Sequence, residues 1–108
     1  YKKESKKMDP GFFVAASDEH INREKNKARE MRHSQWWKNK CANGLCHYCL
    51  ENFAPKTLTM DHIVPISRGG STSRSNIVPC CKECNNQKKH MLPIEWQDYL
   101  ERLSKRKI

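Results

Sequence analysis

The chain has 108 residues, enough for one domain and too few for two ordinary ones. Its formal net charge is +9, which favours a polyanionic partner: most simply nucleic acid, or an acidic membrane surface as the weaker alternative. No apolar run approaches the roughly 20 residues of a membrane-spanning helix, so a spanning segment is excluded. Because only 36% of the residues are hydrophobic, we expect disulfides or a structural metal to stabilise so small a domain.

The N-terminal part divides into an arm and a helix. Residues 1–16 begin with a Lys-, Glu- and Ser-rich stretch and are predicted to form a mobile basic arm and turn. Ser17 is a suitable N-cap, and neither Gly nor Pro follows it up to Lys40. The segment 17–40 is therefore predicted to form a long basic helix over about residues 18–39. Residues 17–108 together are predicted to be a single domain.

The remaining segments, 41–92 and 93–108, are predicted to form the core of the domain and a C-terminal helix with a basic tail. Local patterns predict a strand over 57–64, a loop over 67–75, a short strand over 76–78 stopped by Pro79, a helix over 82–91 and a last helix opened by Pro93. Apolar side chains recur at helical spacing on one stripe of this last helix, and we expect them in the core: Trp96, Tyr99, Leu100 and Leu103. The fold class is α+β.

Six cysteines include two C-x-x-C pairs: Cys46 with Cys49, and Cys81 with Cys84. Two such pairs supply the four thiolates of a closed tetrahedral zinc site, which favours structural zinc over a disulfide scaffold. A thiolate zinc site in turn favours a reducing compartment, so we expect a cytoplasmic protein. Cys80 is an alternative partner for Cys84, and Cys41 is left over as a small buried or free thiol.

A compact polar set lies between and after the pairs: Asp61, His62, Asn76 and Asn85. A carboxylate oxygen of Asp61 and an amide oxygen of Asn85 suit Mg²⁺ or Mn²⁺ next to a substrate phosphate. An imidazole such as that of His62 can deprotonate a water at neutral pH. Taken singly, each residue is more often structural, as a turn former, a cap or a buried pair. The four together, framed by the two C-x-x-C pairs, point to a catalytic site.

These residues stand in a longer pattern that resembles the HNH endonucleases. The pattern comprises Cys46-x2-Cys49, the run from Leu58 to Gly70 (LTMDHIVPISRGG), Asn76-Ile77-Val78-Pro79 and Cys81-x2-Cys84-Asn85-Asn86-x-Lys88. It covers residues 46–90, and the spacing from His62 through Asn76 to Asn85 fits the motif with its third histidine replaced by asparagine. The flanking segments 34–38 and 92–96 also look like small stand-alone bacterial and phage nicking members of the family. The fold that this resemblance implies is a ββα-metal core.

The resemblance also implies roles. His62 looks like the general base that activates water, and Asp61 and Asn85 look like ligands of one catalytic Mg²⁺ or Mn²⁺. Asn76 looks like the residue that holds the imidazole of His62, through its backbone carbonyl. The four cysteines of the two pairs match the structural zinc of the zinc-bearing branch. The implied reaction is hydrolysis of DNA to a 5′-phosphate and a 3′-hydroxyl.

DNA is the expected partner, contacted mainly at its phosphate backbone and with little sequence specificity. Four cations flank the candidate site and are either phosphate contacts or solvated surface charges: Arg68, Arg74, Lys88 and Lys89. His90 is either a supporting residue of the site or a surface histidine. One chain has one site, so a monomer is expected to nick one strand, whereas a double-strand break needs a dimer or two nicks. The rival function is a zinc-stabilised nucleic-acid-binding adaptor with no catalysis.

Overall fold

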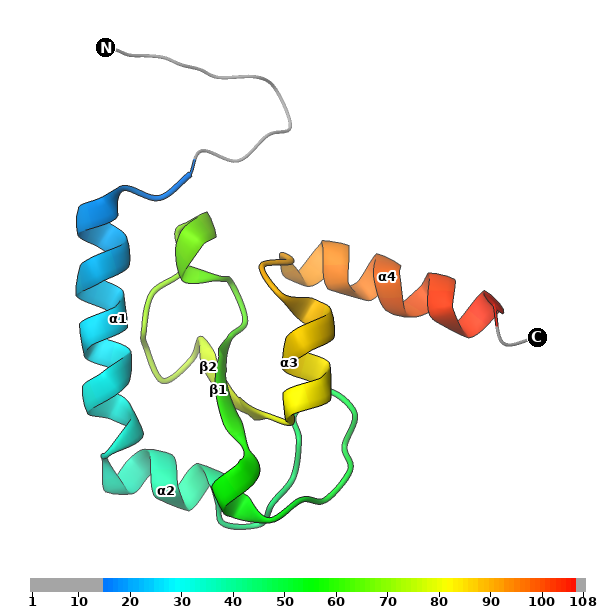
Figure 1. Ribbon diagram of the computed structural model, residues 1–108, viewed down its shortest axis with the longest axis horizontal. Helices are drawn as coiled ribbons and strands as arrows, with labels where there is room; N and C mark the ends of the chain where they lie inside the picture. The colour runs from blue at the N-terminus through cyan, green and yellow to red at the C-terminus, as the bar shows by residue number, and fades with distance from the viewer. Residues whose placement is uncertain (1–14, 107–108) are drawn as a thin grey trace.

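The computed structural model describes residues 15–106, so residues 1–14 of the expected arm lie outside the described residues. Helices surround a small sheet in the following order: α1 (Asp18–Arg32), α2 (Gln35–Cys41), the 3-10 turn η2 (Pro55–Thr57), β1 (Thr59–His62), the 3-10 turn η3 (Ile66–Arg68), β2 (Ile77–Cys80), α3 (Lys82–Lys88) and α4 (Pro93–Arg106). Figure 1 shows α1 and α2 along two sides of β1 and β2, with α3 on the other side of the sheet. The predicted α+β fold class is confirmed.

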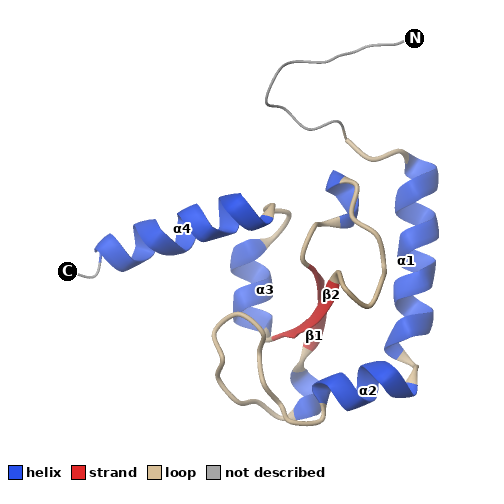
Figure 2. Ribbon diagram, turned by 180° about the vertical axis from the view of Figure 1, so that it is seen from behind, coloured by secondary structure: helices blue, strands red, loops and turns tan. Residues whose placement is uncertain are grey.

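The N-terminal segment forms two helices, so the prediction of one continuous helix over 18–39 is wrong. Ser17 caps α1 by accepting from His20 N, and Ser34 caps α2 by accepting from Trp37 N. A serine whose side chain takes the first free N–H groups of a helix favours a new helix start over continuation. The chain turns a corner between the two helices, as the views from both sides show (Figures 1 and 2).

The two strands pair antiparallel, from Thr59 opposite Cys80 to His62 opposite Ile77. The predicted stop at Pro79 is wrong, because β2 runs through this proline. In a two-stranded antiparallel sheet, every second N–H of a strand points away from its partner, so a proline at such a position costs no ladder bond. The sheet therefore reaches the second C-x-x-C pair without a break.

Two elements are shorter than predicted. The strand expected over 57–64 covers Thr59–His62, because Thr57 closes the turn η2. The helix expected over 82–91 ends at Lys88, where Lys89 takes a positive φ of 51° and breaks the helical path.

The core lies between α2, the sheet and the start of α3. It is a buried apolar cluster of Trp37, Cys41, Cys46, Leu58, Ile77, Cys80 and Cys81. The predicted burial of the α4 stripe is correct only at its start. Trp96 is 5% exposed and packs edge-on against Tyr48 at 5.6 Å between ring centroids, whereas Leu100 is 36% exposed. Helix α4 extends away from the sheet beyond this contact (Figure 1).

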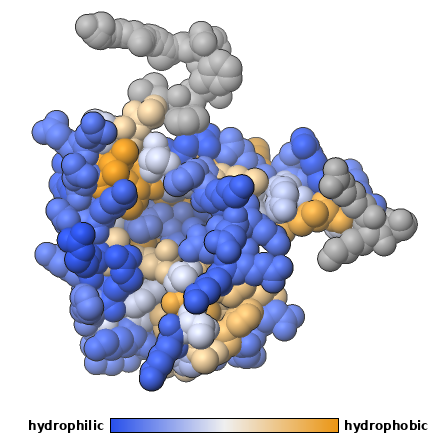
Figure 3. All heavy atoms as spheres, in the orientation of Figure 1, coloured by the Kyte–Doolittle hydropathy of each residue, from blue (hydrophilic) through white to orange (hydrophobic). Residues whose placement is uncertain are grey.

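Helix α1 exposes more cations than carboxylates. Its exposed cations are Arg23, Lys25, Lys27, Arg29 and Arg32, and its exposed carboxylates are Asp18, Glu19 and Glu30. Figure 3 shows that this side of the molecule is largely hydrophilic. No helix within the described part of the chain is long and apolar enough to cross a membrane.

Candidate active site

The two C-x-x-C pairs meet in space. The Sγ atoms of Cys46, Cys49, Cys81 and Cys84 all lie within 4.8 Å of one another. A tetrahedral zinc with Zn–S bonds of about 2.3 Å requires sulfur atoms about 3.8 Å apart, so a small contraction would complete the site. Backbone N–H groups already point at the sulfurs, since Cys81 N lies 3.3 Å from Cys46 Sγ and Cys84 N lies 3.4 Å from Cys81 Sγ. The cluster is compatible with structural zinc.

The cluster uses Cys81 and not its neighbour Cys80. Cys80 is fully buried in the apolar core, and its thiol donates to the Cys81 carbonyl at 3.3 Å. Burial raises the pKa of Cys80, which keeps this thiol neutral. Burial acts in the same direction on Cys46, but N–H groups of Cys49, Cys81 and Tyr48 overcome it and lower the pKa of Cys46 to about 7. A thiol with such a pKa is ready to bind metal as the thiolate.

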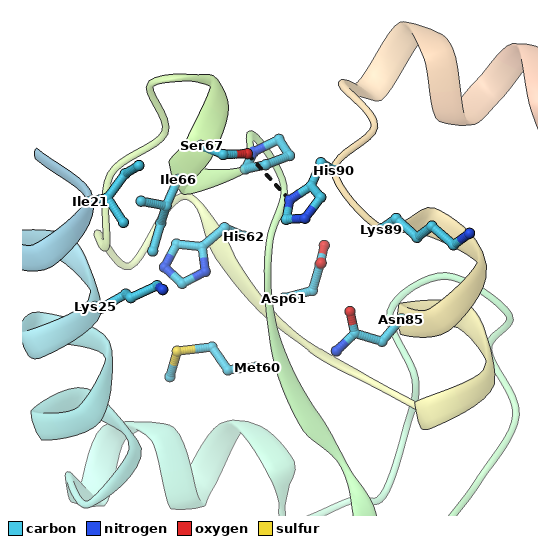
Figure 4. A pocket seen from close by; sticks show the side chains of 11 residues that line it. Ile21, Lys25, Met60, Asp61, His62, Ile66, Ser67, Asn85, Lys89 and His90 are labelled. Carbon is cyan, nitrogen blue, oxygen red and sulfur yellow. Dashed lines mark hydrogen bonds between the residues drawn. The ribbon is translucent and has the colours of Figure 1, made fainter. Parts of the chain in front are cut away.

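A cavity of about 330 Å³ opens beside the sheet (Figure 4). It is bounded by α1, β1, η3 and the end of α3, and its polar lining includes Asp61, His62 and Asn85. The structure thus brings three of the four predicted site residues to one cavity. Figure 4 shows His62 on the α1 side of β1, while Asp61 and Asn85 lie on the α3 side.

Asp61 is buried and held at one of its two oxygens. Its Oδ2 accepts from the Tyr48 hydroxyl at 2.6 Å and lies 3.1 Å from the Lys88 ammonium, which is 1% exposed. Burial, followed by the Asp61 carboxylate, raises the pKa of Tyr48, so the hydroxyl stays protonated as a donor. Among the described residues Oδ1 has no hydrogen-bond partner, and it remains as the oxygen that can bind a cation.

The orientation of the Asn85 amide follows from the hydrogen bonds of Thr59. The Thr59 hydroxyl donates its single proton to the Cys80 carbonyl at 2.8 Å, so it must accept from Asn85 Nδ2, also at 2.8 Å. The amide oxygen of Asn85 therefore faces the other way, on the side of Asp61 (Figure 4). One carboxylate oxygen and one amide oxygen at an open cavity form a donor set that fits a hard divalent cation with several waters.

The His62 imidazole is bonded toward α1. Its Nε2 lies 2.9 Å from the Thr72 hydroxyl, which donates to the Glu24 carbonyl at 2.9 Å. Burial lowers the pKa of His62, against the opposing charge of Asp61. The ring is therefore neutral at neutral pH, the form that can accept a proton.

Asn76 is not among the residues that line this cavity. Its side chain accepts from Val64 N at 3.0 Å and donates to Val64 O at 3.1 Å and to Ser71 O at 2.8 Å. Its backbone carbonyl accepts from Ile63 N at 2.8 Å, whereas the imidazole of His62 bonds to Thr72. Asn76 thus fixes the loop that follows β1, and the expected bond between its backbone carbonyl and the imidazole of His62 is not found among the described residues.

The four flanking cations separate into two groups. Arg68 forms a double ion pair with Glu95 at 2.9 and 3.1 Å and thereby ties η3 to α4, and Lys88 is buried on Asp61. Both side chains are thus engaged within the fold, and their contact with phosphate stays a prediction. Arg74 and Lys89 are exposed.

Four supporting residues were missed from the sequence: Glu24, Tyr48, Thr59 and Thr72. Glu24 carried a usable signal, because it is four residues before Ala28 on the buried stripe of α1, where a carboxylate needs a partner. The two threonines carried none, since their partners are distant in the sequence.

The sequence model of the HNH endonuclease family matches residues 46–100, about half of the chain. A search of curated proteins with the chain found no match. The match contains the four clustered cysteines, Asp61, His62 and Asn85, but not α1 or α2. It places the candidate site within a nuclease family whose substrate is nucleic acid, and the chain is therefore a member of the HNH endonuclease family.

Proposed function

We propose that the protein is a metal-dependent DNA endonuclease that hydrolyses phosphodiester bonds. The observation that carries this proposal is the convergence of Asp61, His62 and Asn85 on one cavity of about 330 Å³. An adaptor that only binds nucleic acid has no need for a neutral imidazole, a carboxylate and an amide that line one cavity.

His62 acts as the general base. Because burial lowers its pKa, the imidazole is neutral and takes a proton from the attacking water. Asp61 Oδ1 and Asn85 Oδ1 would hold one Mg²⁺ or Mn²⁺, which stabilises the negative charge on the phosphate. Cleavage of the bond between phosphorus and the 3′-oxygen leaves a 5′-phosphate and a 3′-hydroxyl. Asn76 supports the site by fixing the loop after β1.

The four clustered cysteines are proposed to hold a structural zinc ion. One pair lies in the loop that contains Tyr48, and the other lies at the start of α3, which contains Lys88. Both residues bind Asp61, so a zinc ion that joins the two segments also fixes the carboxylate. Four thiolates leave zinc no open position, and its role is structural.

DNA is proposed to lie across the cavity and along the basic surface of α1. Arg29 and Arg32 on α1, together with Arg74 and Lys89, are exposed cations that can contact phosphates. Such contacts give salt-sensitive binding with little sequence readout. We propose that residues 17–108 act as one domain with one site, which nicks one strand per encounter as a monomer.

The test is conversion of supercoiled plasmid by the zinc-loaded protein with EDTA, Mg²⁺ or Mn²⁺. The variants are His62→Ala and, as a matched control, His33→Ala, since His33 is an exposed histidine at the end of α1. We expect open circles that require added metal and His62 and that form at an unchanged rate with His33→Ala. An early linear product would indicate a dimer. Retardation of DNA without cleavage under every metal would favour the adaptor, and equal cutting by His62→Ala would overturn the general-base role.

A further inference from the structure

Helix α1 lies outside the family match but contributes a buried carboxylate next to the site. Glu24 is 3% exposed, and its Oε1 accepts from Thr72 N at 2.6 Å. Lys27 at 3.3 Å and Arg23 at 3.6 Å offset its charge at Oε2. A buried carboxylate is retained only where its partners offset the cost of desolvation, so this contact is a built feature of the fold.

Two bonds fix Thr72 on α1. Besides the bond from its backbone N–H to the Glu24 carboxylate, its hydroxyl donates to the Glu24 carbonyl at 2.9 Å. Thr72 is 8% exposed, so water does not compete freely for either bond.

The hydroxyl of Thr72 has a single proton, and that proton is used on the Glu24 carbonyl. In its contact of 2.9 Å with His62 Nε2, the hydroxyl oxygen can therefore only accept. Nε2 must carry the proton in this contact. In a neutral imidazole the other nitrogen, Nδ1, then has the free lone pair.

We infer that Glu24 and Thr72 are positioning residues that hold His62 as the Nε2–H tautomer and so make Nδ1 its basic atom. The tautomer stands on the hydrogen bonds alone, while the use of Nδ1 as the base rests on the proposed function. In that reaction Nδ1 accepts a proton from the attacking water, and the resulting imidazolium carries protons on both nitrogens. The Thr72 hydroxyl continues to accept from Nε2–H throughout, so the ring does not turn.

The direct test is the tautomer of His62 in the zinc-loaded protein without a catalytic metal. Long-range ¹H–¹⁵N correlation of histidine-labelled protein, at a pH where the ring is neutral, distinguishes a protonated from an unprotonated ring nitrogen. The His62 signals are assigned by their loss in His62→Ala. We expect a protonated Nε2 and an unprotonated Nδ1. The reverse pattern, or an even mixture, would overturn the inference, whether or not the protein cuts DNA.

Two matched pairs of variants test the positioning role. Thr72→Val removes the hydroxyl at constant shape and should give a mixture of tautomers and a kcat lower by about tenfold or more, with KM unchanged. Thr72→Ser keeps the hydroxyl and should retain the wild-type spectrum and kcat. Glu24→Ala frees the Thr72 backbone and should resemble Thr72→Val, whereas Glu24→Gln keeps an acceptor and should resemble Thr72→Ser.

The outcomes separate this inference from the proposed function. If the wild-type protein shows the Nε2–H tautomer but never cuts DNA, the inference stands and the nuclease proposal is wrong. If the wild-type protein nicks DNA and Thr72→Val changes neither the tautomer nor kcat, the nuclease proposal stands and the positioning role is wrong.

Discussion

The ammonium of Lys88 lies 3.1 Å from Asp61 Oδ2, and both side chains are buried, at 1% and 6% exposure. The same ammonium donates to the carbonyls of His62 at 3.1 Å and Ile63 at 3.2 Å. This buried ion pair joins α3 to the end of β1. The Lys88 ammonium thus fixes both the Asp61 carboxylate and the backbone of the neighbouring His62.

Replacement of Lys88 is therefore expected to destabilise the fold strongly. Lys88→Met leaves the Asp61 carboxylate buried without its cation, which should lower the free energy of unfolding by about 3–5 kcal/mol. Chemical denaturation with zinc in excess measures the change. Lys89→Met, at an exposed position, is the control and should change stability by no more than about 0.5 kcal/mol. Equal stability of the two variants would show that the buried pair contributes nothing.

Removal of the Thr59 hydroxyl should weaken binding of the proposed catalytic metal. Thr59→Val leaves the Asn85 amide free to turn, so its oxygen no longer faces Asp61 in every molecule. We expect the affinity for Mn²⁺ to fall by about tenfold, as measured by electron paramagnetic resonance of the free ion. Thr57→Val is the control, because within residues 15–106 the Thr57 hydroxyl bonds only to the nearby Ala54 carbonyl. An unchanged Mn²⁺ affinity in Thr59→Val would exclude Asn85 as an oriented ligand.

The adjacent cysteines 80 and 81 should differ in their effect on zinc. Cys81→Ala removes a sulfur of the cluster and is expected to lose bound zinc and cooperative folding. Cys80→Ala leaves the cluster intact and should retain one zinc per chain, with only the modest cost of a small core cavity. Zinc content and thermal unfolding distinguish the two. Zinc retained by Cys81→Ala and lost by Cys80→Ala would reverse the ligand assignment.

Two consecutive glycines should respond differently to alanine. A Cβ at Gly70 would overlap the Val64 carbonyl, whereas a Cβ at Gly69 meets no atom of the described residues within 4 Å. Gly70→Ala is expected to cost about 3 kcal/mol or more and to displace the loop that carries Thr72. Gly69→Ala should cost only about 1–2 kcal/mol, because its φ of +94° is unfavourable for alanine. Denaturation midpoints test the difference, and similar losses in both variants would contradict the close approach.

Stability should depend on pH through Glu24. The hydrogen bond from Thr72 N, partly opposed by burial and aided by Lys27, lowers the pKa of Glu24 below 4.5. A carboxyl whose pKa is lower in the folded state stabilises the fold above its unfolded pKa, and this contribution is lost as the pH falls through the folded pKa.

The comparison for this effect is wild type against Glu24→Gln, by denaturation at decreasing pH with excess zinc. Wild type should be more stable by about 1 kcal/mol at neutral pH, and the difference should vanish in acid. Loss of zinc in acid affects both proteins and cancels in the difference. Glu30→Gln, exposed on the same helix, should show no such trend. A difference that is constant with pH would contradict the charge contribution of Glu24.

The sequence predicted those parts of the site that depend on local spacing. Two C-x-x-C pairs can be recognised without a structure, because each pair reaches a metal from one tight turn. Asp61 and His62 are neighbours on a predicted strand, and Asn85 follows Cys84 directly. The structure brings the cysteines together and places these three residues on one cavity.

The parts that could not be predicted depend on contacts between distant segments. Glu24 and Thr72 are 48 residues apart, and only packing of α1 on the loop after η3 brings them together. The corner between α1 and α2 was missed for a different reason. Ser34 is compatible with the interior of a helix, and its use as an N-cap depends on Trp37 entering the core.

The contact between α1 and Thr72 sets a limit on how this catalytic unit can be moved between proteins. Grafted into an unrelated host, residues 46–100 would carry the cysteines, Asp61, His62 and Asn85, but would leave Glu24 behind. Such a chimaera would also lack Trp37 and Cys41 of the core, so it should fold and bind zinc less stably as well as cut DNA slowly. Its rate should recover only once the host supplies both this packing and a helix whose carbonyl and carboxylate receive Thr72. With the proposed role of Glu24 and Thr72, the portable unit for engineering an active nuclease begins at α1, well before the first cysteine pair.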